Sequence, residues 1–276
     1  MGGLITLTEQ QFKVFQAFIY RHTGIWTQDG KVSLLSNRIR RRLGALGLES
    51  FDAYHDILAA GTVPGELEKF IDVVTTNETH FFRTQAHFDW FAGPFLDGVV
   101  ARAAAGQRER SLRIWSAACS SGEEPYSLAI CLAENAARLE GWEIGILGTD
   151  ISETALAKAR VATYGPRAVE SVVPDRLARH FTVNQAGSSW TLRPEVAGLC
   201  EFRWHNLLEP MPGPKFDCIF IRNVLIYFDN ASKPVALRNL VDALGGGGYL
   251  VVGATDGGHD FLAGLERSST FAYRKP

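Results

Sequence analysis

Two short segments carry the side chains best suited to binding a nucleoside. Residues 117–124 (AACSSGEE) are mostly small and include Gly122, so the backbone there can approach a ligand closely. Asp150 follows an apolar segment of strand length, where an acid can accept hydrogen bonds from the two hydroxyls of a ribose. Each feature also has a plainer interpretation, since Glu123 and Glu124 suit a helix N-terminus and Asp150 suits a helix cap. Together they favour a nucleoside cofactor without specifying which one.

The sequence lacks the patterns of several other sites. Neither Gly-x-x-x-x-Gly-Lys nor Gly-x-Gly-x-x-Gly occurs at this loop, and its two carboxylates would repel a phosphate. We find no Ser-His-Asp set and no metal-binding cluster, and therefore expect no bound metal. The cysteines form no C-x-x-C pair and are expected to be buried reduced thiols: Cys119, Cys131, Cys200 and Cys218.

The composition is that of an ordinary globular protein, with 46% hydrophobic and 21% charged residues. No run of about 18 apolar residues is present, and the start MGGLITLTEQQFKVF lacks a basic segment followed by a long apolar one. We therefore expect a cytoplasmic protein without direct membrane insertion.

The elements that must position these residues begin near Ser111. From there, apolar segments of strand length alternate with helical patterns, which is typical of a parallel sheet with crossover helices. Strands are predicted at 112–116, 144–148, 216–221 and 248–253, and helices at 124–139 and 153–161. Ligands bind beyond the carboxyl ends of such strands, which places the small-residue loop and Asp150 at one edge. The predicted fold is α/β, a doubly wound, Rossmann-like domain over residues 111–276.

Residues 180–206 break this pattern. Segments 181–183, 190–192 and 201–204 alternate in polarity around the turn-like sequence NQAG at 184–187. The sequence therefore predicts a short antiparallel hairpin insert at about 180–206.

The first 76 residues predict a small helical bundle. Thr8 followed by Gln11 predicts a capped first helix, and further helices are expected from about 31, at 50–58 and at 65–74. Residues 1–48 carry seven Lys/Arg and two Asp/Glu, a net charge of +5 in a chain whose net charge is -2. A basic segment suggests an acidic partner, although basic faces are more often only solvated. On the second helix a basic stripe lies beside the apolar face: Lys31, Arg38, Arg41 and Arg42.

Three longer strings resemble the CheR family of chemotaxis receptor methyltransferases: TTNETHFFR at 75–83, IWSAACSSGEEPYS at 114–127 and FDCIFIRNVLIYFD at 216–229. The helical head and the hairpin insert are also features of that family, so the resemblance spans nearly the whole chain. It implies a class I methyltransferase that transfers a methyl group from S-adenosylmethionine to glutamate side chains of chemoreceptors and releases S-adenosylhomocysteine.

The resemblance also implies roles for individual residues. Arg113 and Tyr227 match positions near the transferred methyl group, whereas without the resemblance Arg113 would be a solvated strand-edge residue and Tyr227 a core residue. Residues 1–76 would contact the receptor through the basic stripe, and residues 77–110 would link the domains and close over the cofactor. The implied cofactor-binding residues are Asn77, Thr79, Arg83, Glu123, Asp150, Asn206, Leu207, Asn223 and Val224.

The implied reaction needs little acid–base chemistry. A glutamate carboxylate is a nucleophile at neutral pH and a sulfonium methyl is already activated, so alignment and exclusion of water should supply most of the rate. Arg113 would hold the incoming carboxylate by a charge-assisted hydrogen bond, and Tyr227 would orient it.

The sequence departs from the family pattern at two loops. Segment 184–189 is short and lacks a Gly-x-Gly, so docking of a receptor C-terminal pentapeptide is not expected. Residues 253–258 (GATDGG) replace a more usual Gly-His-Ser-Glu, so the local loop shape is expected to differ.

Two alternatives remain from the sequence. A nucleic-acid methyltransferase of the same fold is disfavoured by the pI of about 6.4, and no nucleic-acid partner is expected. A catalytically silent sensor or scaffold is disfavoured because Asn77, Arg83, Glu123, Asp150 and Tyr227 are all present. We expect a monomer that is recruited to membrane-bound receptor arrays.

Overall fold

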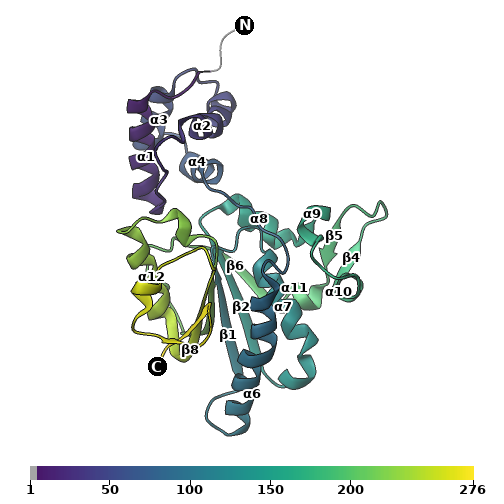
Figure 1. Cartoon of the computed structure of the whole chain (residues 1–276). Coiled ribbons are helices and arrows are strands. Elements are labelled where there is room, and N and C mark those ends of the chain that lie inside the picture. Colours follow the sequence, from purple (N-terminus) through teal and green to yellow (C-terminus); the bar gives the residue numbers. More distant parts are fainter. Residues whose placement is uncertain (1–4) are drawn as a thin grey trace.

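The computed structural model describes residues 5–276 and has a helical head above an α/β body. Figure 1 shows the head at the top, the central sheet below it and a small second sheet projecting to the right. The first four residues of the predicted head, 1–4, lie outside the described part of the chain.

The head consists of four helices: α1 (Glu9–Thr23), α2 (Val32–Leu46), α3 (Phe51–Ala60) and α4 (Glu66–Val74). The predicted cap of α1 is confirmed, because Thr8 Oγ1 accepts the Gln11 N–H at 3.2 Å and Gln11 Oε1 accepts the Thr8 N–H at 3.0 Å. The apolar faces meet around buried rings, including Phe15, Tyr54 and Phe70. The helical bundle predicted from the periodicity is therefore confirmed.

The body is built on a seven-stranded sheet in the order β6-β2-β1-β7-β8-β10-β9. Its strands are β1 (Ser111–Ala117), β2 (Glu143–Asp150), β6 (Cys200–Trp204), β7 (Phe216–Ile221), β8 (Leu244–Val252), β9 (Glu266–Arg267) and β10 (Ala272–Arg274). The first five in spatial order are parallel and β10 and β9 are antiparallel. The four predicted strands are confirmed, three of them with bounds that differ by one to four residues.

Helices cover both faces of this sheet because successive strand residues point to opposite sides. Ile114 packs in the cluster with α5 (Gln85–Trp90), η1 (Phe91–Phe95), α6 (Leu96–Ala104) and α7 (Glu123–Glu134), whereas Trp115 packs in the cluster with α12 (Ser232–Ala243). The helix predicted at 124–139 is α7 followed by η2 (Ala136–Leu139), and the helix predicted at 153–161 is α8 (Glu153–Val161).

The predicted insert is correct in its hairpin and wrong in its third strand. β4 (Phe181–Val183) and β5 (Trp190–Leu192) pair antiparallel, but their third partner is β3 (Thr163–Tyr164). Segment 200–204 is β6, which pairs in parallel with β2 at the edge of the main sheet. An edge strand covered on one face has the same alternating pattern as a hairpin strand, with Phe202 buried between exposed Glu201 and Arg203. Short helices complete this region: α9 (Pro166–Val169), α10 (Pro174–His180) and α11 (Pro194–Ala197).

The head is joined to the body by hydrogen bonds on two sides. The α1–α2 loop meets η3 (Leu225–Tyr227) and its flanks, where the Trp26 N–H donates to the Tyr227 carbonyl at 2.8 Å and Ser232 Oγ donates to the Gly24 carbonyl at 2.9 Å. On the other side Asp72 of α4 accepts from Ser152 Oγ at 2.6 Å, beside the start of α8. These contacts leave a pocket between the head and the body.

Candidate functional site

A cavity of about 550 Å³ lies between the head and the carboxyl edge of the sheet. Its walls come from the α1–α2 loop and α2, the linker 74–83, and the loops that follow β1, β2, β6 and β7. The volume falls in the range of small-molecule sites, and the position is where a parallel sheet binds ligands.

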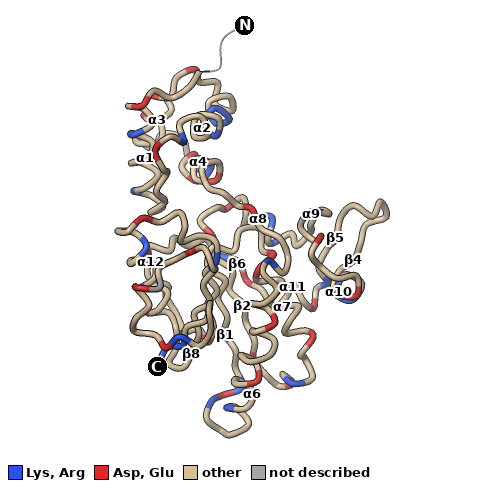
Figure 2. Tube along the Cα trace, in the orientation of Figure 1, with Lys and Arg blue, Asp and Glu red and all other residues tan. Residues whose placement is uncertain are grey.

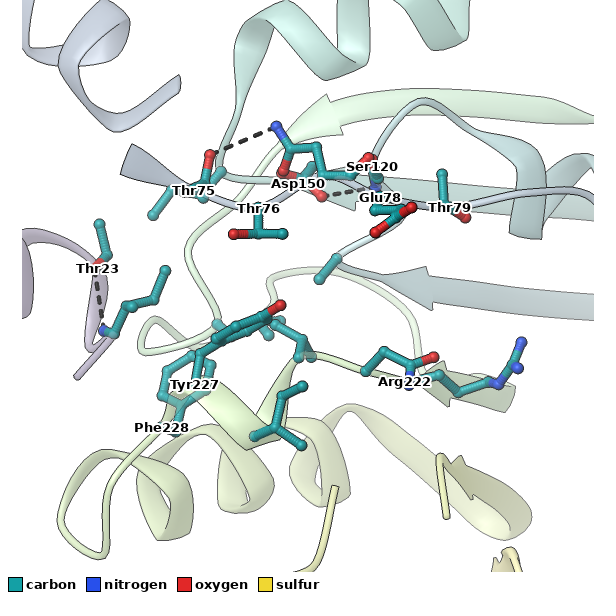
Figure 3. A pocket seen from close by; sticks show the side chains of 18 of the residues that line it. Thr23, Thr75, Thr76, Glu78, Thr79, Ser120, Asp150, Arg222, Tyr227 and Phe228 are labelled. Carbon is teal, nitrogen blue, oxygen red and sulfur yellow. Dashed lines mark hydrogen bonds between the residues drawn. The ribbon is translucent and has the colours of Figure 1, made fainter. Parts of the chain in front are cut away.

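Asp150 lines this pocket at the end of β2. Its carboxylate is buried and accepts the Ser120 N–H at 2.7 Å (Figure 3). It also accepts the Ser152 N–H at 2.9 Å. The cap of α8 is Ser152, whose Oγ accepts the Ala155 N–H at 3.1 Å, so the helix-cap interpretation of Asp150 is wrong. Burial raises the pKa of Asp150, and the backbone N–H donors oppose that shift. Each carboxylate oxygen keeps a lone pair for a further donor.

The two acids after β1 have different positions. Glu124 lines the pocket and accepts from Ser116 Oγ at 2.7 Å. Glu123, the predicted cofactor ligand, is buried and accepts from Ser121 Oγ at 2.8 and 3.0 Å, and it does not line the pocket. In this structure Glu123 therefore shapes the loop, while Glu124 faces the cavity.

Arg222 is a buried cation that the sequence analysis did not single out. Its guanidinium pairs with Glu124 at 3.0 Å, donates to the Arg83 carbonyl and lies over the Phe88 ring at 5.7 Å. It therefore fixes the linker to the end of β7. The signal in the sequence was a charged residue directly after the four apolar residues Cys218–Ile221 that end the strand.

The linker 74–83 forms one wall of the pocket, and Asn77, Thr79 and Arg83 all line it. Asn77 Nδ2 donates to Ser152 Oγ at 3.2 Å, and the Arg83 guanidinium donates to the Glu78 carbonyl at 3.1 Å. Phe82 has a left-handed φ of 55°, which is costly for an aromatic residue. Its N–H donates to Ser127 Oγ at 2.9 Å, which holds this strained conformation in place.

The loop after β7 brings Asn223, Val224 and Tyr227 to the pocket, and the loop after β6 brings Asn206 and Leu207. Figure 3 shows the Tyr227 ring reaching into the cavity with its hydroxyl on the side of the linker. Of the nine residues implied to bind the cofactor, only Glu123 lies outside the lining.

Asp256 organises the loop after β7 from a distant part of the chain. Its carboxylate is 1% exposed and accepts the Asn223 N–H at 2.6 Å and the Leu225 N–H at 2.9 Å. Asn223 has a left-handed φ of 59°, and successive N–H groups in such a bend form an anion-binding nest. A Cβ at Gly253 would collide with Asp256 Oδ2, so the glycine makes room for this acid. The departure from the family pattern at 253–258 therefore includes a residue that supports the site.

Arg113 is not at the site, which contradicts its predicted catalytic role. Its side chain is exposed near the start of β1, outside the pocket lining, and its backbone N–H donates to Asp217 Oδ2 at 2.9 Å. Arg113 precedes the carboxyl end of β1 at Ala117 by four residues, which is about 13 Å along a strand. The arginines at the pocket are Arg38, Arg83 and Arg222.

The basic stripe of α2 is only partly as predicted. Lys31 and Arg38 line the pocket and Arg41 is exposed, and Figure 2 shows Lys and Arg gathered on this helix. Arg42 instead makes a bidentate ion pair with Glu66, in which its Nε and Nη2 donate to the two carboxylate oxygens at 2.8 and 2.7 Å. Glu66 also accepts a hydrogen bond from the Tyr54 hydroxyl at 2.8 Å. Because this pair is largely buried, the prediction that Arg42 binds substrate is wrong.

Among the described side chains of residues 5–258 and 260–276, no group of three or more His, Cys, Asp or Glu is arranged to hold a metal ion. Cys119, Cys131 and Cys218 are buried thiols whose pKa values are raised by burial, while Cys200 is only partly buried. No helix in the described part of the chain is long and apolar enough to span a bilayer.

Comparison with known proteins gives matches over nearly the whole chain. Residues 77–260 match the family described as "CheR methyltransferase, SAM binding domain", and residues 10–75 match "CheR methyltransferase, all-alpha domain". A chemotaxis protein methyltransferase of Salmonella typhimurium is 37% identical over 93% of this chain and 86% of its own length. The chemotaxis protein methyltransferase of Escherichia coli K12 is 36% identical over 93% of this chain and 87% of its own length. Chemotaxis protein methyltransferase 1 of Pseudomonas aeruginosa is 36% identical over 89% of each chain.

Proposed function

The chain belongs to the CheR family of S-adenosylmethionine-dependent methyltransferases, and on this premise we propose that it methylates glutamate side chains of chemoreceptors. Its relatives are named for chemotaxis, and a basic surface adjoins its pocket. The observation that carries the proposal is the pocket itself, where a nucleoside-binding acid and several cations meet at one sheet edge.

The residues present fit S-adenosylmethionine. The cavity is of suitable size, and Asp150 offers carboxylate oxygens to ribose hydroxyls beside the small loop Ala118–Ser120. Asn77, Thr79, Asn206, Leu207, Asn223 and Val224 form the other walls. Bound there, the cofactor supplies a methyl group that its sulfonium has already activated.

We assign Arg83 the role first given to Arg113. The buried guanidinium of Arg222 is already neutralised by Glu124, whereas that of Arg83 lines the pocket and donates only to a carbonyl in the contacts described. An arginine free of acidic partners can hold an incoming carboxylate by charge-assisted hydrogen bonds. Tyr227 would orient that carboxylate through its hydroxyl. The linker and the α1–α2 loop would exclude water from the reacting groups.

The proposed roles divide among three parts of the chain. Residues 1–76 would contact the receptor through Lys31, Arg38 and Arg41, residues 77–110 would close over the cofactor, and residues 111–276 would bind it. Receptors would then bring the enzyme to membrane-bound arrays, where it would act as a monomer and without nucleic acid.

The test is transfer of labelled methyl from S-adenosylmethionine to receptor-bearing membranes, with alkaline release of methanol as the readout. We expect base-labile label on the receptor. Arg83→Ala should lower kcat strongly while S-adenosylmethionine still binds, and Arg113→Ala is the matched control that should retain activity. Label that survives alkali, or cofactor binding with no transfer to any receptor, would refute carboxylate methylation.

A further inference from the structure

The small sheet β3-β5-β4 and the helices α9 and α10 form an insert that projects from the body (Figure 1) and contacts the linker. The Phe81 N–H donates to the Ala168 carbonyl of α9 at 3.0 Å. The Phe81 ring is fully buried and meets the rings of Tyr164 in β3 and Phe181 in β4 edge to face, at 4.8 and 5.2 Å between centroids. The linker is therefore packed into the insert at the residue that precedes Phe82.

Arg176 of α10 extends this contact to Phe82. Its guanidinium lies over the Phe82 ring, 4.4 Å from the centroid. The Nε and Nη2 atoms of the same guanidinium donate to the two carboxylate oxygens of Glu134 at 2.9 and 3.0 Å. A bidentate pair fixes the plane of an arginine as well as its position, and only 21% of the Arg176 side chain is exposed. The insert therefore presents a fixed cation to the linker.

The linker needs support at this point because its backbone is strained. Phe82 has a φ of 55° and Thr84 has a φ of 64°, so Arg83 stands between two left-handed residues. Such conformations are unfavourable for residues that carry a Cβ, and they persist only where the surroundings hold them. If Phe82 relaxed to an extended conformation, the chain would turn at Arg83 and move its side chain. The direction of Arg83 therefore depends on the contacts that hold Phe82.

Arg176 is placed to act on the pocket through Phe82. Arg176 lies outside the cavity lining, whereas Arg83 belongs to it. The Phe82 ring is 3% exposed and also meets the Phe88 ring edge to face at 5.3 Å, while its N–H is bound by Ser127. Those two contacts come from the body, and the contact with Arg176 comes from the insert.

We propose that Arg176 is a positioning residue for methyl transfer, which holds the Phe82 ring and thereby directs the Arg83 guanidinium into the pocket. The insert is then a brace for the linker, and this function requires no receptor tail. The inference rests on the carboxylate-binding role proposed for Arg83, and it adds a second arginine that acts without touching the substrate.

Arg179 provides a matched control on the same helix. It approaches the same carboxylate, that of Glu134, at 3.6 Å and also pairs with Asp175, but 52% of its side chain is exposed. Among the contacts of the described residues, those of Arg179 stay within α10 and Glu134. Loss of Arg179 therefore removes an ion pair from Glu134 and leaves the Phe82 ring covered by Arg176.

The experiment measures methyl transfer by full-length variants and their affinity for S-adenosylmethionine by calorimetry. We expect Arg176→Ala to lower kcat about tenfold, because a misplacement of about 1 Å can cost up to about 100-fold in rate. The Kd for S-adenosylmethionine should change by less than about threefold, because Asp150 and Asn206 keep their positions. Arg176→Lys keeps a cation beside the ring and should recover part of the loss. Arg179→Ala should change kcat by less than about twofold.

A double variant tests whether Arg176 acts through Arg83. In an enzyme that already carries Arg83→Ala, Arg176→Ala should change the residual kcat by less than about twofold, since the residue that it positions is absent. An equal further loss in that background would overturn the inference, and so would a wild-type kcat in Arg176→Ala. If Arg176→Ala does not fold, Phe82→Leu removes the ring and keeps an apolar side chain. It should lower kcat in the same way, and a wild-type kcat there would also overturn the inference.

Hydrogen exchange of the linker amides separates this inference from the proposed function, because it needs no substrate. Arg176→Ala should speed the exchange of the Phe82 and Arg83 amides, whereas Arg179→Ala should leave it unchanged. Faster exchange together with no methyl transfer to any receptor by the wild-type enzyme would support the brace and overturn receptor methylation. Unchanged exchange in Arg176→Ala would overturn the brace whether or not transfer occurs.

Discussion

Arg41 and Arg42 are adjacent cations, one exposed and one largely buried. Replacing each by alanine distinguishes a role in stability from a role in substrate binding. Arg41 is exposed on α2, whereas Arg42 pairs with Glu66, whose side chain is only 1% exposed. We expect Arg42→Ala to destabilise the head and Arg41→Ala to leave stability unchanged. Conversely, Arg41→Ala should raise the KM for receptor and Arg42→Ala should not do so at temperatures where it is folded.

The magnitude follows from the burial of the pair. Removing one partner of a fully buried ion pair costs about 3–5 kcal/mol. Arg42 keeps 17% of its side-chain exposure and Tyr54 still donates to Glu66 in the variant. We therefore expect a loss of about 2–3 kcal/mol, or a fall in Tm of about 4–8 °C. Arg41→Ala should stay within about 0.5 kcal/mol of the wild type.

The pair also predicts how this difference depends on pH. Burial alone would raise the pKa of Glu66, but the hydrogen bonds from Arg42 and Tyr54 outweigh burial and lower it. A lowered pKa means that the carboxylate stabilises the fold above its ordinary pKa, and that this contribution is lost as the pH falls through the lowered value. The Tm difference between the two variants should therefore shrink in acid.

Thermal unfolding followed by circular dichroism measures the stability, and initial rates of methyl transfer at varied receptor concentration measure the KM. The reasoning would be refuted if Arg42→Ala unfolded within about 1 °C of Arg41→Ala and raised the KM equally. Arg42 would then belong to the substrate surface, as the helical wheel first suggested.

Three further changes test the pocket and its supports. Asp256→Asn places an amide NH₂ against the N–H of Asn223 or Leu225. We expect this change to lower kcat and to reduce the free energy of unfolding in urea by about 1–3 kcal/mol. An unchanged kcat would mean that the loop keeps its shape without the carboxylate. Gly24→Ala puts a Cβ 2.8 Å from Leu208 Cδ1 at a residue whose φ is 72°. The free energy of unfolding should therefore fall by about 1–3 kcal/mol. A variant as stable as the wild type would show that the head can shift relative to the body to make room. Because burial raises the pKa of Asp150, S-adenosylmethionine affinity measured by calorimetry should fall as the pH is lowered through that raised value, when the carboxylate gains a proton. A flat profile, or an Asp150→Asn variant that binds as tightly as the wild type, would exclude Asp150 as the ribose acceptor.

Some errors of the sequence analysis came from information that was present but not used. Arg113 is four residues upstream of the carboxyl end of β1, and the strand rise alone puts its side chain far from the loop that follows. Arg83, in the TTNETHFFR string, lines the cavity, and we propose it for that role instead. The distance of Arg113 from the carboxyl end of β1 could therefore have excluded it from the pocket before the structure was known.

Other errors could not have been avoided from one sequence. The alternation in 200–204 fits any strand with one buried face, and only the pairing with β2 makes it part of the main sheet. Similarly, helical periodicity places Arg42 on one face of α2, but its partner Glu66 lies on α4. Whether the two side chains meet depends on how these two helices pack. Pairing of this kind is non-local, so local patterns do not report it.

The sequence by itself determined the local elements and the identity of the family. Caps, apolar periodicity and strand-length segments predict the helices of the head and most strands of the body because these features depend on neighbouring residues. The TTN, SGEEPYS and RNVLIYFD strings identify the family to which the chain belongs. Tertiary structure decided which charged side chains face that pocket. Arg42 and Glu123 are neutralised or hydrogen-bonded elsewhere, whereas Asp256 supports the site from a separate loop, because the cost of burying a charge is met by partners that only folding brings together.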